Sequence, residues 1–213
     1  NVLNQFSMDE FDNHFRIATT TNEYYVRSEA PEKNHVYVLD MDMNVVGKLE
    51  DIAPGERIYS ARFIGNRLYL VTFKKIDPLF VIDLSDPAEP AILGKLKIPG
   101  YSDYLHPYDE NHIIGVGKET TESEEGNFAW YQGVKLSLFD VADVENPKEL
   151  AKYNIGDRGT DSYALHDHKA FLFDKSRNLL VLPILLAEIK EEQFENKEVP
   201  SWAYGNFVWQ GAY

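Results

Sequence analysis

The chain has 213 residues, of which 44% are hydrophobic and 13% aromatic, so it can bury a core and is expected to form a single domain over 1–213. Its formal net charge of −14 argues against nucleic acid and anionic membrane surfaces as partners, because both bind basic proteins. It has no cysteine for disulfides or thiolate metal sites, and no apolar run long enough for direct membrane insertion.

The first repeat begins after a polar segment, 1–13, which is predicted to be a helical or irregular lead-in. Predicted strands at 14–21, 35–40 and 45–50 match the second, third and fourth strands of a repeat that is complete further along. The turn Asp40–Asn44 has the Asp-x-Asp-x-Asn start of a calcium loop, but it lacks that loop's glycine and terminal glutamate. We therefore predict an ordinary turn there, and a first repeat without a recognisable innermost strand.

The complete repeat lies at 58–101 and contains four short aromatic or β-branched segments bounded by turn residues. These segments are 59–64, 67–73, 78–84 and 91–98. Gly65-Asn66 joins the first two as a hairpin, and the proline-containing turn 85–90 joins the last two. The repeat is therefore predicted to be an antiparallel meander of about 43 residues.

A third repeat contains both halves of this meander in the same order. Residues 104–116 repeat the first hairpin, 134–141 repeat the third strand, and a fourth strand is predicted at 148–155. Between the halves, 118–126 has no apolar period and is predicted to be a solvated loop.

The last repeat is predicted to follow the linker 156–161, with an inner hairpin formed by 170–173 and 179–184. An acidic insertion, 188–202, leads to 206–213, which repeats the Asn-Phe-x-Trp…Gln-Gly entry into the preceding third strand. We thus expect the chain to be a piece of a longer protein that stops inside a third strand. Its open ends are expected to leave apolar faces bare and to favour self-association.

The length of the repeated meander predicts the fold. A single meander cannot bury both of its faces, and a repeat of about 40 to 50 residues is typical of a β-propeller blade. We therefore predict an all-β fold, a β-propeller fragment of about four four-stranded antiparallel blades, two complete and two partial.

These patterns resemble the bacterial and archaeal secreted proteins that carry a C-terminal β-propeller domain distantly related to tryptophan-aspartate repeats. The resemblance rests on 58–63, 77–87, 103–112 and 167–173, and 79–87 also looks like the short LVIVD repeats of bacterial surface proteins. It implies a secreted or cell-surface location, and it transfers no activity.

Three long connections, 19–34, 118–133 and 187–206, are predicted between second and third strands, which in a propeller emerge on one face. These connections, together with the strand that follows the last of them, carry aromatic side chains among carboxylates: Tyr24, Tyr25, Trp130, Tyr131, Trp202, Tyr204 and Trp209. We predict that these rings bind a protein, a peptide or a carbohydrate, which makes the chain a non-catalytic binding or scaffold module. The alternative is that the rings only fix the long loops to the rim.

A histidine and acid group defines the other candidate site. His166-Asp167-His168 precedes a predicted innermost strand, and His106 and Asp109 lie in the innermost hairpin of the preceding blade. In an extended stretch, His166 and His168 project to one side, as a metal pair requires. The alternative function is therefore a metal-dependent or hydrolytic enzyme at the channel mouth, holding calcium or another divalent metal. No third ligand and no Gly-x-Ser-x-Gly motif are evident, structural histidines are the competing interpretation, and no cofactor is predicted.

Overall fold

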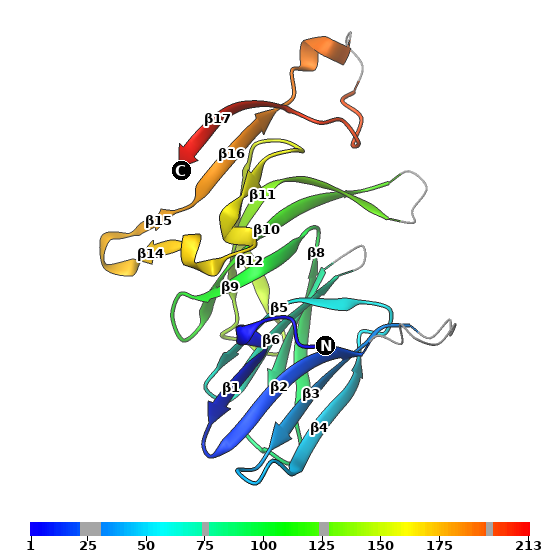
Figure 1. Cartoon of the computed structure of the whole chain (residues 1–213), viewed down its shortest axis with the longest axis vertical. Coiled ribbons are helices and arrows are strands. Elements are labelled where there is room, and N and C mark those ends of the chain that lie inside the picture. The colour runs from blue at the N-terminus through cyan, green and yellow to red at the C-terminus, as the bar shows by residue number, and fades with distance from the viewer. Residues whose placement is uncertain (22–30, 74–76, 124–127, 195–197) are drawn as a thin grey trace. The chain divides into compact units, whose positions relative to one another are not determined.

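The computed structural model describes residues 1–21, 31–73, 77–123, 128–194 and 198–213, and its regular structure is almost entirely β-strand (Figure 1). The chain divides into two compact units. Unit 1 comprises Asn1–Ile98 and Asp140–Lys148, and unit 2 comprises Pro99–Phe139 and Glu149–Tyr213. Among the described residues, no helix is long and apolar enough to cross a bilayer.

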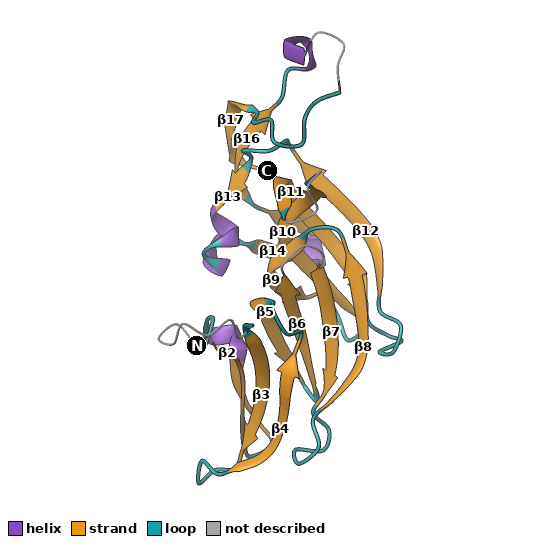
Figure 2. Ribbon diagram, turned by 90° about the vertical axis from the view of Figure 1, so that its right-hand side faces the viewer, coloured by secondary structure: helices purple, strands orange, loops and turns teal. Residues whose placement is uncertain are grey.

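Unit 1 contains two four-stranded antiparallel meanders that lie side by side (Figure 2). After the 3₁₀ helix η1 (Gln5–Ser7), their strands are β1 (Met8–Phe11), β2 (His14–Thr21), β3 (Lys33–Leu39) and β4 (Val45–Ile52), then β5 (Arg57–Ile64), β6 (Arg67–Phe73), β7 (Asp77–Asp83) and β8 (Ala91–Ile98). Apolar residues of both sheets form one buried core, with Val36 and Val38 of β3 and Leu68 and Leu70 of β6 fully covered. These pairs are two residues apart because alternate residues of a strand point to the same face.

The first blade has an innermost strand, so the prediction that it lacks one is wrong. Strand β1 pairs with β2 along its whole length, from Met8 opposite Ile17 to Phe11 opposite His14. The side chains of β1 are mostly exposed, so its sequence carries no apolar alternation by which a strand is recognised. Backbone pairing and the contacts of Asp9 hold it in place instead.

Unit 2 contains a four-stranded meander, a three-stranded sheet in the order β13-β16-β17 and a two-stranded hairpin. Its strands are β9 (Tyr101–Pro107), β10 (His112–Glu122), β11 (Ala129–Asp140), β12 (Lys148–Ile155), β13 (Asp161–Ser162), β14 (Leu172–Asp174), β15 (Leu179–Val181), β16 (Pro183–Glu188) and β17 (Asn206–Ala212). Four 3₁₀ helices lie between them: η2 (Tyr163–Leu165), η3 (His168–Ala170), η4 (Lys175–Arg177) and η5 (Glu191–Phe194). The predicted all-β fold of four-stranded antiparallel blades is confirmed.

The last blade differs from its prediction at the inner strand. The predicted hairpin forms, because β14 pairs with β15, but it is a separate two-stranded sheet. The strand beside β16 is β13, which lies at the end of the segment expected to be a linker, with Asp161 opposite Leu185 and Ser162 opposite Ile184. A strand of two residues is too short to leave a periodic pattern in the sequence.

In the third blade, residues 118–122 of the predicted loop 118–126 belong to a strand. Strand β10 continues to Glu122 and β11 begins at Ala129. The polar side chains of this stretch are used inside unit 2: the hydroxyl of Thr120 accepts a hydrogen bond from the backbone N–H of Gly100 at 2.9 Å, and Lys118 donates to the carbonyl of Thr160. Internal polar contacts thus stabilise a strand that has no apolar period.

The third strands of the first three blades end in the same way. The carboxylates of Asp40, Asp83 and Asp140 each accept a hydrogen bond from the backbone N–H two residues further on, at 2.9, 3.0 and 2.9 Å. Such aspartate turns stop a strand and reverse the chain. At Asp40 the carboxylate also accepts the backbone N–H of Asn44 at 2.8 Å, so the predicted turn at 40–44 is confirmed.

Candidate functional site

Arg158 lies between two aromatic side chains of unit 2. The central carbon of its guanidinium is 4.6 Å from the centroid of the Trp130 ring and 4.3 Å from that of the Tyr204 ring. Nη1 donates a hydrogen bond to the carbonyl of Tyr131 at 3.2 Å, and Nη2 donates to the hydroxyl of Tyr204 at 3.3 Å. Trp130 and Tyr131 belong to β11 and Tyr204 precedes β17, so one side chain from the β12–β13 linker joins three segments.

Two hydrogen bonds to main-chain carbonyls also join these segments. The carbonyl of Arg158 accepts a hydrogen bond from the N–H of Gly205 at 2.7 Å, and the side-chain amide of Gln132 donates to the carbonyl of Ser201 at 2.9 Å. Gly159 has a φ of 108°, which glycine adopts without the strain that a side chain would bring. The connection from β16 to β17 is therefore tied to both β11 and the linker.

Aromatic rings of these segments are open to solvent. Tyr131 is 43% exposed, Trp202 is 59% exposed and Tyr204 is 67% exposed, while Trp130 is half-buried. We call the two aromatic segments that Arg158 joins, Trp130-Tyr131 and Trp202 to Tyr204, the aromatic surface. Arg158 contacts the rings of Trp130 and Tyr204, whereas the ring of Tyr131 packs against that of Tyr101 with centroids 5.3 Å apart. Tryptophan and tyrosine combine a flat apolar face with a hydrogen-bonding group, and they dominate the energetics of many binding interfaces.

Trp209, also predicted to bind ligand, has a different ring partner. Trp209 lies on β17, where its ring contacts that of Tyr213 with centroids 6.5 Å apart. Tyr24 and Tyr25 lie outside the described residues. Of the seven predicted residues, the structure brings the rings of Trp130 and Tyr204 together on Arg158, and it brings the segments of Tyr131 and Trp202 near them through main-chain contacts alone.

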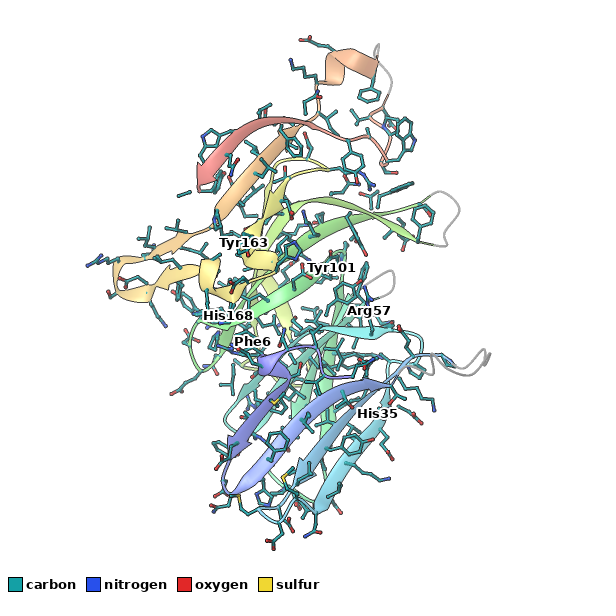
Figure 3. All side chains as sticks on the ribbon, in the orientation of Figure 1. Phe6, His35, Arg57, Tyr101, Tyr163 and His168 are labelled. Carbon is teal, nitrogen blue, oxygen red and sulfur yellow. The ribbon has the colours of Figure 1, made fainter. Side chains whose placement is uncertain are left out.

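The His166–His168 segment is not extended, so the predicted projection of both imidazoles from one strand face is wrong. His166 ends η2 with helical backbone angles, and His168 begins η3. Figure 3 shows Tyr163 and His168 on the turns that follow β13. The side chains of Ser162 and Asp167 cap these turns by accepting backbone N–H groups, which favours 3₁₀ structure over a strand.

His106 and Asp109 have separate partners. The His106 ring is 4.8 Å from that of Phe171, and its Nδ1 is 3.0 Å from the hydroxyl of Tyr104. Asp109 lies 2.7 Å from Nδ1 of His112, and its pKa is lowered to about 2 by the backbone N–H of Asn111 and then by His112.

Metal binding by His106, Asp109, His166 and His168 stays a prediction. In the described part of the chain, no three His, Cys, Asp or Glu side chains are grouped so that they could hold a metal ion together.

A titratable cluster that the sequence analysis missed lies at the inner strands of unit 2. Lys118 Nζ of β10 is 3.1 Å from Oδ1 of Asp161 in β13, and Asp161 Oδ2 is 3.9 Å from Nε2 of His166. Burial raises the pKa of Asp103, on β9, to about 7, against the attraction of Lys118. This carboxyl group can therefore gain or lose a proton near neutral pH.

The sequence analysis singled out neither Arg158 nor Asp103. Each stands at a position where the earlier repeats have another residue type. Arg158 precedes the linker glycine where the earlier linkers have Pro54 and Pro99, and Asp103 occupies the place of Ala61 in the Tyr-Ser-x segment of the inner strand. An alignment of the repeats marks these positions as unusual, but it does not show what the side chains contact.

Repeated four-stranded antiparallel meanders whose third strands end in aspartate turns are the blades of a β-propeller. The chain belongs to the family described as the beta propeller domain, whose model matches residues 1–213. It is 45% identical over 182 residues to an uncharacterised protein of Methanocaldococcus jannaschii, covering 85% of this chain and 27% of the relative. It is 43% identical over 182 residues to an uncharacterised protein of Archaeoglobus fulgidus, covering 85% and 26%. The chain spans about a quarter of the length of these relatives.

Proposed function

We propose that this chain is a non-catalytic binding module of an extracytoplasmic β-propeller protein, and that its aromatic surface binds a polypeptide rich in basic side chains. One observation carries the proposal: Arg158 fixes the β11 end and the β16–β17 connection to each other, while Tyr131, Trp202 and Tyr204 stay open. A surface that is ordered before binding loses less conformational entropy when it takes up a partner. The location rests on the resemblance to secreted propeller proteins.

The chemistry of the chain favours a basic partner over a neutral one. A net charge of −14 attracts cationic partners and raises the rate at which they associate. Lysine and arginine side chains also stack on the faces of tryptophan and tyrosine, each contact contributing about 0.5–1 kcal/mol at exposed sites. The position of Arg158 between Trp130 and Tyr204 is an example of this contact inside the molecule.

The test is binding of an array of lysine- and arginine-rich peptides, with a glycan array measured in parallel. We expect Trp202→Ala and Tyr204→Ala each to weaken peptide binding by about tenfold, the effect of losing one well-placed aromatic contact. Tyr163→Ala is the matched control, because Tyr163 is 65% exposed and lies in η2 rather than on the aromatic surface. Circular dichroism spectra of all three variants should match that of the wild type.

Two results would contradict this proposal. If Trp202→Ala and Tyr204→Ala bind the basic peptides as well as the wild type does, the aromatic surface is not the binding site. If glycans bind through these rings and basic peptides do not, the partner is a carbohydrate.

A further inference from the structure

Asp103 is the extra residue of a β-bulge on the innermost strand β9. In the register of β9 and β10, Ser102 lies opposite Gly117 and Tyr104 lies opposite Val116, so Asp103 has no partner on the neighbouring strand. A bulge changes the direction of a side chain, and bulges are frequent beside functional sites. In the described part of the chain, no hydrogen bond or ion pair fixes the Asp103 carboxyl group. The bulge therefore sets the position of this group.

The charged and titratable groups around Asp103 come from β10, β13 and the turn that ends η2. Lys118 of β10 favours the charged form of Asp103, and Asp161 of β13 disfavours it. Lys118 Nζ lies 3.1 Å from Oδ1 of Asp161, and it donates a hydrogen bond to the carbonyl of Thr160. Nε2 of His166 lies 3.9 Å from Oδ2 of Asp161. A charged Asp103 would therefore compete with Asp161 and Thr160 for a single ammonium group.

The linker between β12 and β13 joins this cluster to the aromatic surface. At one end, the hydroxyl of Thr160 donates a hydrogen bond to the carbonyl of Ala187 at 3.0 Å and accepts one from its N–H at 2.9 Å. Further along, the carbonyl of Arg158 accepts the N–H of Gly205 at 2.7 Å. Gly159 lies between Arg158 and Thr160 with a φ of 108°, where glycine can change its backbone angles with little strain. A loss of the bonds at Thr160 would thus reach Arg158 directly.

We propose that protonation of Asp103 controls how firmly the linker holds Arg158 and thereby regulates the aromatic surface, an inference that rests on the proposed function. With Asp103 neutral, Lys118 bonds Thr160 and Asp161, as in the structure. When Asp103 loses its proton, it attracts Lys118 and repels Asp161, and the end of the linker loosens. The surface is then less ordered before binding and takes up a basic peptide more weakly.

The change falls in an accessible pH range and has a distinctive direction. Burial raises the pKa of Asp103 to about 7, so its proton is lost between about pH 6 and 8. Over the same range the chain only becomes more negative, and net charge alone would strengthen the binding of a basic peptide. An affinity that falls as the pH rises therefore separates this regulation from simple charge attraction.

The first measurement needs no ligand and uses NMR of the isotope-labelled protein over this pH range. We expect the ¹³C carboxyl resonance of Asp103 and the amide resonances of Ala187 and Gly205 to titrate together. Hydrogen exchange of the Gly205 amide, corrected for the intrinsic effect of pH on exchange, should be about fivefold or more faster at the high end. Asp103→Asn, which copies the neutral form, should remove both effects. Asp174→Asn is the matched control, because Asp174 caps η4 and should leave them unchanged.

The second measurement is binding of the basic peptides at about pH 6 and about pH 8. We expect the wild type to bind about fivefold or more weakly at the higher pH, and Asp103→Asn to keep the tighter binding at both. Lys118→Met removes the ammonium group and should bind weakly at both pH values, with fast exchange at the Gly205 amide. Circular dichroism checks that this variant folds, and the comparison of the wild type with Asp103→Asn stands without it.

The proposal is overturned if the Asp103 carboxyl group titrates while the amides of Ala187 and Gly205 do not respond. It is also overturned if Asp103 does not titrate in this range, or if binding by Asp103→Asn falls with pH as it does for the wild type. Failure of every basic peptide to bind at either pH would instead contradict the proposed function. Titration of the linker amides in that same protein would still support their coupling to Asp103.

Discussion

The guanidinium of Arg16 and the carboxylate of Asp9 form two parallel hydrogen bonds, from Nε at 2.8 Å and from Nη2 at 2.6 Å, although Arg16 is only 2% exposed. Nη1 of Arg16 also donates to the carbonyl of Gly65 at 2.7 Å, in the turn between β5 and β6. The rings of Phe11 and Phe63 lie 4.7 and 5.2 Å from the guanidinium carbon. One buried arginine thus connects the short β1 to both sheets of unit 1.

Asp9→Ala should lower the free energy of unfolding by about 2–4 kcal/mol, because it leaves the buried Arg16 without its counter-charge. Urea titration measures this change. Glu10→Ala, in the same strand but exposed, is the control and should stay within about 0.5 kcal/mol of the wild type. Replacing both partners, as Asp9→Leu with Arg16→Met, should cost less than Asp9→Ala alone, and a larger loss in the double variant would contradict this account.

Asp103 should make the protein less stable as the pH rises. Its pKa is raised by burial from 3.8 to about 7, so the folded chain holds the proton more tightly than the unfolded chain does. The stability from this group is fully present below about pH 4 and is lost as the pH rises through about 7. Asp103→Asn should remove this part of the pH dependence and be more stable than the wild type at pH 8, on the order of 1–2 kcal/mol.

Thermal or urea unfolding at several pH values between 4 and 8 gives the comparison. Asp42→Asn, in an exposed turn, should keep the pH profile of the wild type. An Asp103→Asn profile that runs parallel to that of the wild type would show that Asp103 ionises normally in the folded chain.

Gly94→Ala should destabilise the protein by about 1–3 kcal/mol, because the new methyl group forces the Val144 carbonyl away from β8. The matched control is Ala151→Gly, the reverse change at the equivalent residue of β12, which should alter stability by no more than about 1 kcal/mol. Differential scanning calorimetry of both variants decides the point. A Gly94→Ala protein as stable as the wild type would mean that the turn does not press against the strand.

Arg158→Lys should weaken binding at the aromatic surface even though every ring is kept. Lysine keeps the charge, but it lacks the planar guanidinium that lies between Trp130 and Tyr204. That group also donates hydrogen bonds to the carbonyl of Tyr131 and the hydroxyl of Tyr204. We expect faster hydrogen exchange at the Gly205 amide and about tenfold weaker binding of the basic peptides. Arg177→Lys, at a side chain 78% exposed, is the control, and an Arg158→Lys protein that behaves like it would remove the positioning role of Arg158.

Self-association is expected at high concentration, because unit 2 exposes large apolar side chains on several strands: Leu150, Tyr153, Leu172, Leu179, Phe207, Val208 and Trp209. At about 25 cal/mol per Å², covering a few hundred Å² of such surface stabilises association by several kcal/mol before the entropic cost of binding. Light scattering over a dilution series measures the effect. A strictly monomeric protein at the highest concentration would contradict the expectation.

The sequence by itself determined the repeated part of the fold. Alternating apolar residues such as Leu68 and Leu70, hairpin signals such as Gly65-Asn66, and aspartate turns such as that at Asp83 act within a few residues of each other. Local patterns of this kind are visible in the order of the residues, and they predicted the repeated meanders except for the innermost strand of the first blade. They also placed Trp130, Tyr131, Trp202 and Tyr204 together as candidates.

Only the tertiary structure decided where polar side chains replace the apolar pattern. Strand β1 is held by Arg16, the continuation of β10 is held by contacts of Lys118 and Thr120, and the aromatic surface is assembled by Arg158. The partners of these residues are separated from them in sequence, by 7 residues for Arg16 and Asp9 and by 46 for Arg158 and Tyr204. Hydrogen bonds and ring contacts depend on distances and angles in space, so residue order alone does not reveal them.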